Sequence, residues 1–177
     1  YDWVVSAIPG PQALELLPKS LSMIEQITQI NMQSCFCLML GFYQAPPLDF
    51  DAALVHGEDI SWISVNNSKP GRNTPFSLVA HSSNKWADAH LEIDRIEVMH
   101  YLKKQLSEVL GIQFVEPAHQ DIHAWRFANI AKQKGSGYLI DEVNQVAVCG
   151  DWLIQGRIEA AFTSGYNLAQ HLVKILG

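Results

Sequence analysis

The sequence has 177 residues, of which 48% are hydrophobic and 17% are charged, so it is long enough to fold as a globular protein with a substantial core. Its formal net charge of −6 argues against a nucleic-acid partner, because no basic stripe is present to displace counterions from a phosphate backbone. The longest apolar run, residues 35–43, is too short to cross a membrane, and no charged-then-apolar leader is present. We therefore expect a soluble, cytoplasmic protein.

The first third of the sequence predicts a strand, two helices and a second strand. Tyr1–Ile8 has the composition of a buried strand and ends at a Pro-Gly-Pro turn. Gln12–Leu17 and Leu21–Ile30 follow as short helices, each with apolar residues on one side. Ser34–Tyr43 then predicts a strand with both faces buried, since apolar residues occupy both alternating sets.

The three cysteines are expected to be reduced core residues. Cys35 and Cys37 lie in this second strand and Cys149 lies in a later apolar run. They form neither an even set for disulfides nor a zinc spacing with nearby histidines, and the histidines themselves do not fall at metal spacing. The sequence therefore predicts no metal site.

Three short strands are predicted in the middle of the chain, at Ala52–His56, Ile60–Val65 and Phe76–His81, and their tight connections favour an antiparallel sheet. The loop between the last two contains Lys69 and Arg72 among turn residues. Two cations in a loop would suit an anionic or carbonyl group of a substrate. The alternative is a solvated polar loop without a binding role.

The next predicted elements are a helix and a strand. Asp94–Gly111 has the pattern of a helix that begins at a capping box, carries one apolar stripe and ends at glycine. In the following strand, Asp121–Ala128, alternation places His123, Trp125 and Phe127 on one face. Such a row could stack a planar ring and bind its edge. The alternative is a buried aromatic cluster with a satisfied histidine.

The last third of the sequence predicts a buried strand, Val146–Cys149, that runs through Gly150-Asp151 into a helix from about Ile158 to Leu176. We expect a buried side of this helix that contains Phe162, Leu168, Leu172 and Leu176, and the small residues Ala160, Ala161 and Gly165 would let the helix approach a flat partner closely. A helix start beyond the carboxyl end of a strand offers free N–H groups to an anionic or carbonyl oxygen. The alternative is an amphipathic terminal helix that simply packs on a sheet.

The segment Cys149-Gly150-Asp151-Trp152 with Gly156-Arg157-Ile158-Glu159-Ala160-Ala161 resembles the C-terminal flavin motif of the FAD-dependent amine oxidase superfamily, in particular its renalase-like branch. The sequences SKPGR, HSSNKWADAHLE and H-x-W-R-x-A are also similar to that branch. The resemblance implies a cofactor-binding segment made of Gly150, Asp151, Trp152, Arg157, Ile158, Glu159 and Ala160. It also implies substrate-binding roles for Lys69, Arg72, His123 and Trp125, with His123 as the candidate catalytic residue to test.

The resemblance further implies an α+β fold. An antiparallel substrate-binding domain flanked by helices is expected over residues 19–144, and 1–18 with 145–177 are expected to be strand–helix pieces of a Rossmann-like FAD-binding domain. No GxGxxG occurs in the sequence, so we interpret it as a fragment that lacks the N-terminal FAD-binding region and that binds FAD poorly by itself. In the amine oxidases themselves the strand equivalent to Ser34–Tyr43 carries a lysine. This sequence has no lysine there, and its absence favours the renalase-like branch.

Two functional hypotheses follow from these observations. The first is the C-terminal part of a flavin-dependent oxidoreductase that positions a small planar donor, a reduced nicotinamide dinucleotide or an amine, against FAD. The second is a non-catalytic α+β module that binds a small molecule without a cofactor. A yellow intact protein with flavin absorbance would support the first hypothesis.

Overall fold

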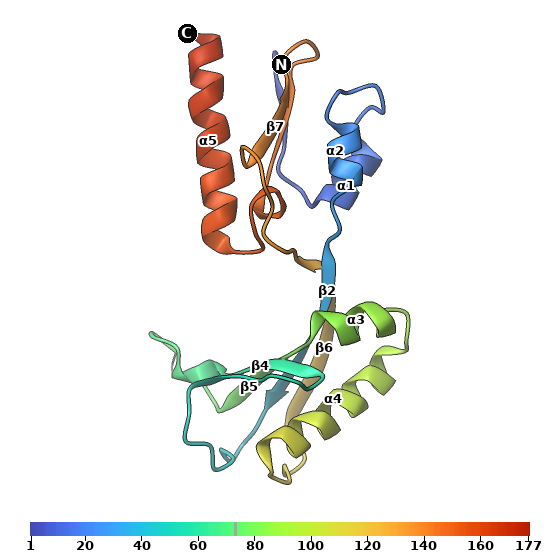
Figure 1. Ribbon diagram of the computed structural model, residues 1–177. Helices are drawn as coiled ribbons and strands as arrows, with labels where there is room; N and C mark the ends of the chain where they lie inside the picture. The colour runs from blue at the N-terminus through green and yellow to red at the C-terminus, as the bar shows by residue number, and fades with distance from the viewer. Residues whose placement is uncertain (73) are drawn as a thin grey trace. The chain divides into compact units, whose positions relative to one another are not determined.

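The computed structural model describes residues 1–72 and 74–177. The chain divides into two compact units, one made of Tyr1–Met32 with Phe127–Gly177 and the other of Gln33–Arg126 (Figure 1). Helices and strands in each unit confirm the predicted α+β class. Residues 19–32 and 127–144 pack with the two ends of the chain, so the limits of the compact units differ from the domain limits predicted from the sequence. Substrate binding by residues 19–144 stays a prediction.

The first unit is built on a three-stranded sheet in the order β1-β8-β7. β1 (Val4–Ser6) is parallel to β8 (Val146–Cys149), and β7 (Tyr138–Asp141) is antiparallel to β8. Successive β8 residues point to opposite faces of the sheet. Ala147 and Cys149 therefore pack with α5 (Ile158–Leu176), while Val148 packs with α1 (Gly10–Leu16) and α2 (Ile24–Thr28).

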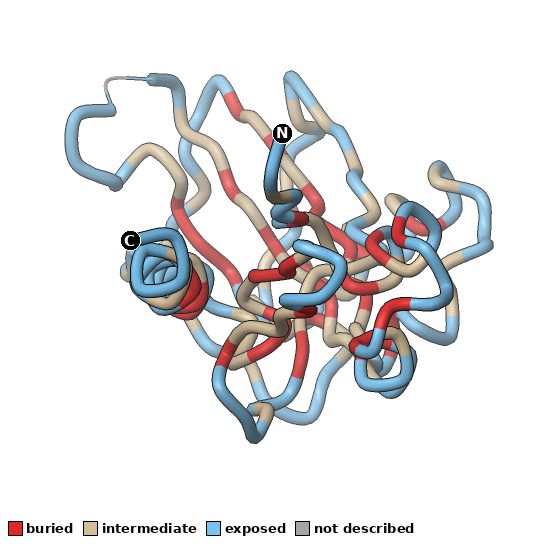
Figure 2. Tube along the Cα trace, turned by 90° about the horizontal axis from the view of Figure 1, so that it is seen from above, coloured by how far each residue is buried: buried red, intermediate tan, exposed pale blue. Residues whose placement is uncertain are grey.

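Two predictions in this unit are wrong. The first strand is not buried, because β1 spans only three residues at the edge of the sheet and exposes Val4 and Val5. The buried side of α5 does not contain Phe162 or Leu176, which are both exposed. The predicted burial of Leu168 is confirmed, and Leu172 packs against the same cluster. The other buried positions of α5 are Ala160 and Ser164, whose small side chains allow the helix to lie close to the sheet. Figure 2 looks along α5 and shows the buried positions on one side of it.

The second unit is a five-stranded sheet with the strand order β3-β4-β5-β2-β6. Pairing is antiparallel between β3 (Ala52–Leu54) and β4 (Ile60–Val65), between β4 and β5 (Ser77–Ser82), and between β5 and β2 (Gln33–Gly41). The predicted antiparallel arrangement of the three short strands is confirmed. A 3₁₀ turn, Asn66–Ser68, follows β4, and β6 (His119–Asn129) lies beside β2.

Two helices cover one face of this sheet and close its core. α3 (Asn84–His90) and α4 (Arg95–Leu110) pack against the strands through Trp86, Leu102 and Leu106 (Figure 1). α4 begins where the Asp94 carboxylate accepts hydrogen bonds from two backbone N–H groups, and it ends at Gly111 in the left-handed conformation, as predicted.

α3 was not predicted. It is a seven-residue helix whose start is stabilised by the Ser83 side chain, which accepts a hydrogen bond from the Trp86 N–H. So short a segment shows little apolar periodicity, and its position is decided by the burial of Trp86 and Ala87 against β2. Across residues 1–72 and 74–177, no helix is both long and apolar enough to cross a lipid bilayer.

Candidate functional site

The link from β8 to α5 is held by a short chain of hydrogen bonds. The Gly150 N–H donates to the Ser164 hydroxyl oxygen at 2.8 Å, and that hydroxyl donates to the Gly137 carbonyl at 2.6 Å. Ser164 is fully buried on the inner side of α5. One side chain thus fixes the end of β8 and the start of β7 relative to the helix.

Trp152 is a core residue that shapes this link. Its side chain is 1% exposed, and its indole N–H donates to the Ile8 carbonyl at 3.0 Å. A Cβ placed on Gly150 would lie 2.5 Å from the indole nitrogen, so only glycine fits beside this ring. Because its ring is buried, Trp152 can affect cofactor binding only by positioning the backbone around it.

The start of α5 presents free hydrogen-bond donors. Arg157 occupies the N-cap position without a side-chain hydrogen bond to the helix, and its carbonyl accepts from the N–H groups of Ala160 and Ala161. In the described part of the chain, the N–H groups of Ile158 and Glu159 have no acceptor. Both residues are exposed, so these two donors can bind an anionic or carbonyl oxygen supplied by a ligand.

The remaining predicted cofactor residues lie around this helix start. Gly156 allows close packing, because a Cβ there would lie 2.3 Å from the Asn129 side-chain oxygen. Arg157 is exposed, and none of the ion pairs between described residues involves it or Asp151. Asp151 begins a 3₁₀ turn, Asp151–Leu153, directly after the carboxyl end of β8. Both charged groups are thus available to a ligand at that end of the strand.

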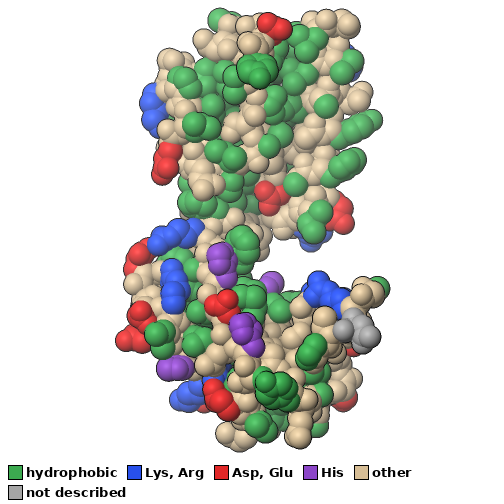
Figure 3. All heavy atoms as spheres, turned by 180° about the vertical axis from the view of Figure 1, so that it is seen from behind, with side chains coloured by type: hydrophobic (Ala, Val, Ile, Leu, Met, Phe, Trp, Pro, Cys, Tyr) green, Lys and Arg blue, Asp and Glu red, His purple; other side chains and the backbone are tan. Residues whose placement is uncertain are grey.

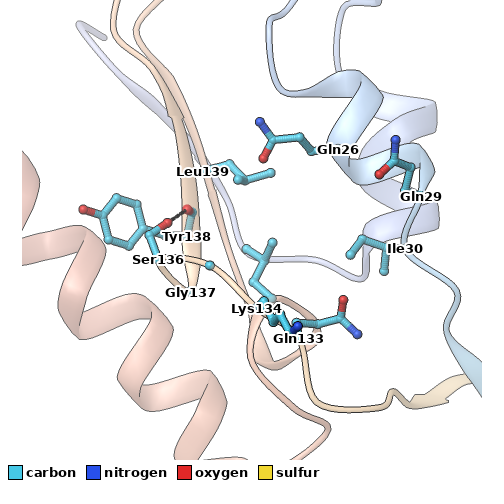
Figure 4. A pocket seen from close by; sticks show the side chains of 11 residues that line it. Gln26, Gln29, Ile30, Gln133, Lys134, Ser136, Gly137, Tyr138 and Leu139 are labelled. Atoms are coloured by element: carbon cyan, nitrogen blue, oxygen red, sulfur yellow. Dashed lines mark hydrogen bonds between the residues drawn. The ribbon is translucent and has the colours of Figure 1, made fainter.

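A pocket of about 340 Å³ opens nearby in the same unit. Figure 4 shows Gln26 of α2 and the two residues that follow the helix, Gln29 and Ile30, on one side of it, and Leu139 of β7 on the other. Gln133 and Lys134 come from the loop before β7. The pocket lies at the carboxyl end of β8, since the neighbouring Tyr138 pairs with Cys149. Ligands of α/β sheets bind outside such strand ends. None of the cofactor-binding residues expected from the sequence lines this pocket.

The second unit offers a sheet face opposite to α3 and α4. Because Leu38, Ile63 and Ala80 point into the core, their neighbours in each strand point away from it. Strand register aligns Trp62 of β4 with His81 of β5, and His81 with Cys37 of β2. These side chains form a row that we call the outer-face row. Figure 3 views the molecule from behind and shows histidine, acidic and hydrophobic side chains close together on the unit that contains residues 33–126.

His123 and Trp125 lie on the corresponding face of β6. Ile122 and Ala124 pack against the core, so the residues that alternate with them face outward, as predicted. The two rings meet edge to face with centroids 4.3 Å apart. Trp125 is 55% exposed, so the alternative of a buried aromatic cluster is wrong. An exposed tryptophan on a sheet face is a ready surface for a planar ligand.

Charge on the outer-face row is kept low. Burial lowers the pKa of His81, and the nearby Lys69 ammonium lowers it further. Burial raises the pKa of the Cys37 thiol to about 11, with smaller contributions from Cys35 and Asp121 in the same direction. At neutral pH this row therefore presents a neutral imidazole and a protonated thiol.

The two predicted loop cations differ in their surroundings. Lys69 lies close enough to His81 and Cys37 to affect the pKa of both, and its ammonium donates to the Asn66 side chain at 2.8 Å. Arg72 donates to the Asn66 carbonyl at 3.4 Å. Lys69 thus lies within electrostatic range of the outer-face row. Sequence reasoning missed Trp62, His81 and Cys37 as site candidates, although alternation in their strands placed each of them opposite a core residue.

Comparison with known proteins places these features in a family. Residues 1–173 match the model of a family described as flavin containing amine oxidoreductase. The fold is similar to that of a protein from Exiguobacterium sp. 255-15 assigned as a protoporphyrinogen oxidase, with a TM-score of 0.76 and 15% identity over 99% of this chain and 42% of that one. Cyclohexylamine oxidase from Brevibacterium oxydans IH-35A gives a TM-score of 0.66 and 18% identity, over 98% of this chain and 43% of that one.

A putrescine oxidase bound to putrescine has a TM-score of 0.65 and 15% identity, over 97% of this chain and 42% of that one. At these identities the structural likeness shows the fold alone. The chain spans less than half the length of each of these proteins.

Proposed function

Because the chain belongs to the family of flavin-containing amine oxidoreductases, we propose that it forms the substrate-facing part of an FAD-dependent oxidoreductase of the renalase-like branch. The observation that carries this proposal is the exposed His123–Trp125 pair on an open sheet face, within a chain that matches the family from residue 1 to residue 173. A donor with a planar ring can stack on the tryptophan and bind the imidazole through its edge.

The cofactor side of the proposal rests on the start of α5. A bound flavin would supply the hydride chemistry of the reaction. The free N–H groups of Ile158 and Glu159 fit a flavin, because its carbonyl edge offers the acceptor that these donors lack in the described chain. Asp151, which begins the turn after β8, would bind the polar chain of the cofactor. Trp152 and Ser164 hold this backbone in position from the core.

The substrate side of the proposal rests on β6 and the outer-face row. β2 carries no lysine, which supports the renalase-like branch rather than an amine oxidase with a lysine in that strand. Lys69, whose charge acts on His81, would bind an anionic or carbonyl group, and the exposed Arg72 would assist it. A reduced nicotinamide dinucleotide carries both a planar ring and phosphate groups, so we favour it over a cationic amine as the donor.

The test is flavin reduction by the intact flavoprotein, followed anaerobically in a stopped-flow instrument with NADH, NADPH or a primary amine as the donor. We expect Trp125→Ala and His123→Ala to slow reduction by about tenfold or more, the loss expected when one positioning contact is removed. His100→Ala, an exposed histidine on α4, serves as the matched control and should leave the rate unchanged.

The outcomes separate the parts of the proposal. If His123→Ala reduces its flavin as fast as the unchanged protein, the role of His123 is wrong while the flavin assignment stands. If the intact protein is colourless and gains no colour with FAD, the oxidoreductase function itself is wrong and the non-catalytic binding module takes its place.

We also propose that the 177-residue chain binds FAD poorly by itself. The sequence contains no GxGxxG loop, which in dinucleotide-binding folds receives the pyrophosphate. Titration of the chain with FAD, followed by flavin fluorescence, should show no saturation in the micromolar range. Micromolar binding would contradict this expectation.

A further inference from the structure

The outer face of the second sheet carries a second exposed tryptophan, Trp62, in addition to Trp125. Trp62 lies on β4 and is 37% exposed, although the next residue, Ile63, is fully buried. Its cross-strand partner on β3, Leu54, is 63% exposed and extends the apolar surface beside the indole. An exposed tryptophan is a surface on which a planar ring can stack. The proposed function uses Trp125 and leaves Trp62 without a role.

The two tryptophans are too far apart to bind the same ring. The strand order places β5 and β2 between β4 and β6, so Trp62 and Trp125 are separated by three strand spacings, or about 14 Å. A ring stacked on one tryptophan therefore does not reach the other. A ligand that contacts both must carry two separate rings joined by a linker.

The surface between the two tryptophans suits a linker with negative charge. Burial lowers the pKa of His81 and raises the pKa of Cys37, so both of these groups are uncharged at neutral pH. The Lys69 ammonium lies close enough to act on both of them. Asp121 acts on Cys37 with the opposite sign and belongs to β6, whereas the loop that carries Lys69 follows β4. Positive charge thus predominates on the β4 side of the face, where it complements a phosphate bridge.

We infer that Trp62 binds the adenine ring of a dinucleotide donor, whose reduced nicotinamide ring stacks on Trp125 and whose pyrophosphate crosses the outer-face row beside Lys69. A reduced nicotinamide dinucleotide has this layout, because its two rings stand at opposite ends of a phosphate bridge. A simple amine or a mononucleotide has at most one such ring and leaves Trp62 unused. The inference rests on the proposed function and adds to it a residue that selects a dinucleotide over a smaller donor.

The contribution of Trp62 should appear in binding and not in the chemical step. Stacking of one base on an aromatic side chain strengthens binding by about tenfold or more. The adenine ring is remote from the reacting ring, so this contact is equally strong before and during hydride transfer. Such uniform binding changes the Kd of the donor and leaves the limiting rate of flavin reduction unchanged.

The test is anaerobic reduction of the intact flavoprotein over a range of donor concentrations, which separates the Kd of the donor from the limiting rate. NADH is compared with reduced nicotinamide mononucleotide, which keeps the reacting ring and one phosphate but lacks adenine. Trp62→Ala should raise the Kd for NADH about tenfold and leave its limiting rate unchanged. The same variant should leave both constants of the mononucleotide unchanged, which also shows that the site is still folded.

Two further variants serve as controls. Trp62→Phe keeps an aromatic ring and should restore most of the affinity for NADH. Tyr43→Ala removes an aromatic ring that is 94% exposed and lies outside the strands of the sheet, so it should leave the Kd for both donors unchanged.

The contrary results are distinct from one another. An unchanged Kd of Trp62→Ala for NADH would overturn the inference, although the proposed function would stand. An equal rise in Kd for NADH and for the mononucleotide would also overturn it, because Trp62 would then support the site without binding a second ring. If neither donor reduces the flavin of the unchanged protein, the donor class of the proposed function is wrong and the inference falls with it.

Discussion

Replacing Gly150 by alanine is the sharpest test of how the end of β8 is built. The added Cβ would lie 2.5 Å from Nε1 and 2.7 Å from Cδ1 of Trp152, so the indole must move by about 1 Å to reach an ordinary contact distance. It has little room to do so, because its other edge lies against Gly10 and the ring is buried.

The cost of Gly150→Ala has two sources. Overpacking a filled core costs about 1–3 kcal/mol, and moving the indole breaks its hydrogen bond to the Ile8 carbonyl, which costs about 1–3 kcal/mol when the donor stays buried. We expect a loss of about 3 kcal/mol in the free energy of unfolding. Backbone strain is not a source, since Gly150 is extended, with φ 160° and ψ 163°.

Urea unfolding, together with hydrogen exchange of the β8 amides, measures this loss in the unit that contains β8. Gly165→Ala is the matched control, because an added Cβ meets no atom within 4 Å and alanine favours a helix interior by about 1 kcal/mol. Combining Gly150→Ala with Trp152→Phe should cost less than the sum of the two, since the smaller ring leaves room. An unchanged stability of Gly150→Ala would refute the packing argument.

Three further predictions concern other buried groups. Ser164→Ala should lower the free energy of unfolding by about 1–3 kcal/mol, because it removes both hydrogen bonds of that hydroxyl. Thr163→Ala, at an exposed position, should change it by less than about 0.5 kcal/mol. Equal effects of the two substitutions in urea titrations would contradict this. Hydrogen bonds from Ser22 and Asn144 lower the pKa of Asp141 to about 2, so its stabilisation is complete above its ordinary pKa of 3.8 and is lost as the pH falls toward 2. Asp141→Asn should therefore flatten the fall in stability between pH 4 and pH 2, and an unchanged slope would contradict the assignment. With a pKa of about 11, Cys37 should be alkylated by iodoacetamide about tenfold faster for each pH unit up to that value, and a plateau near pH 8 would show an ordinary thiol.

Several elements were predictable because their signals are local. The Asp94 cap and Gly111 end of α4 act within one helical turn, so sequence spacing alone located that helix. The continuous apolar run of β8 predicted a strand buried on both faces, and three of its four residues are buried. Alternation along β6 likewise predicted the shared face of His123 and Trp125.

The candidate site was less predictable because it joins distant segments. The outer-face row depends on the register of three strands, which no single strand encodes. The pocket joins residues 26–30 to residues 133–139, which lie more than 100 positions apart. Composition gave no sign that Lys69 would lie close to His81.

α5 shows most clearly where sequence alone stops. Its composition and spacing determined that a helix begins at Ile158 and ends at Leu176, and its motif determined the family resemblance that the family match confirms. Because the helix has two apolar faces, periodicity cannot tell which of them is buried. The small size of Ala160 and the spacing of Leu168 were readable from the sequence, but only the tertiary structure decided that Ser164 packs on the sheet beside them while Phe162 and Leu176 stay exposed, since close packing favours small side chains there.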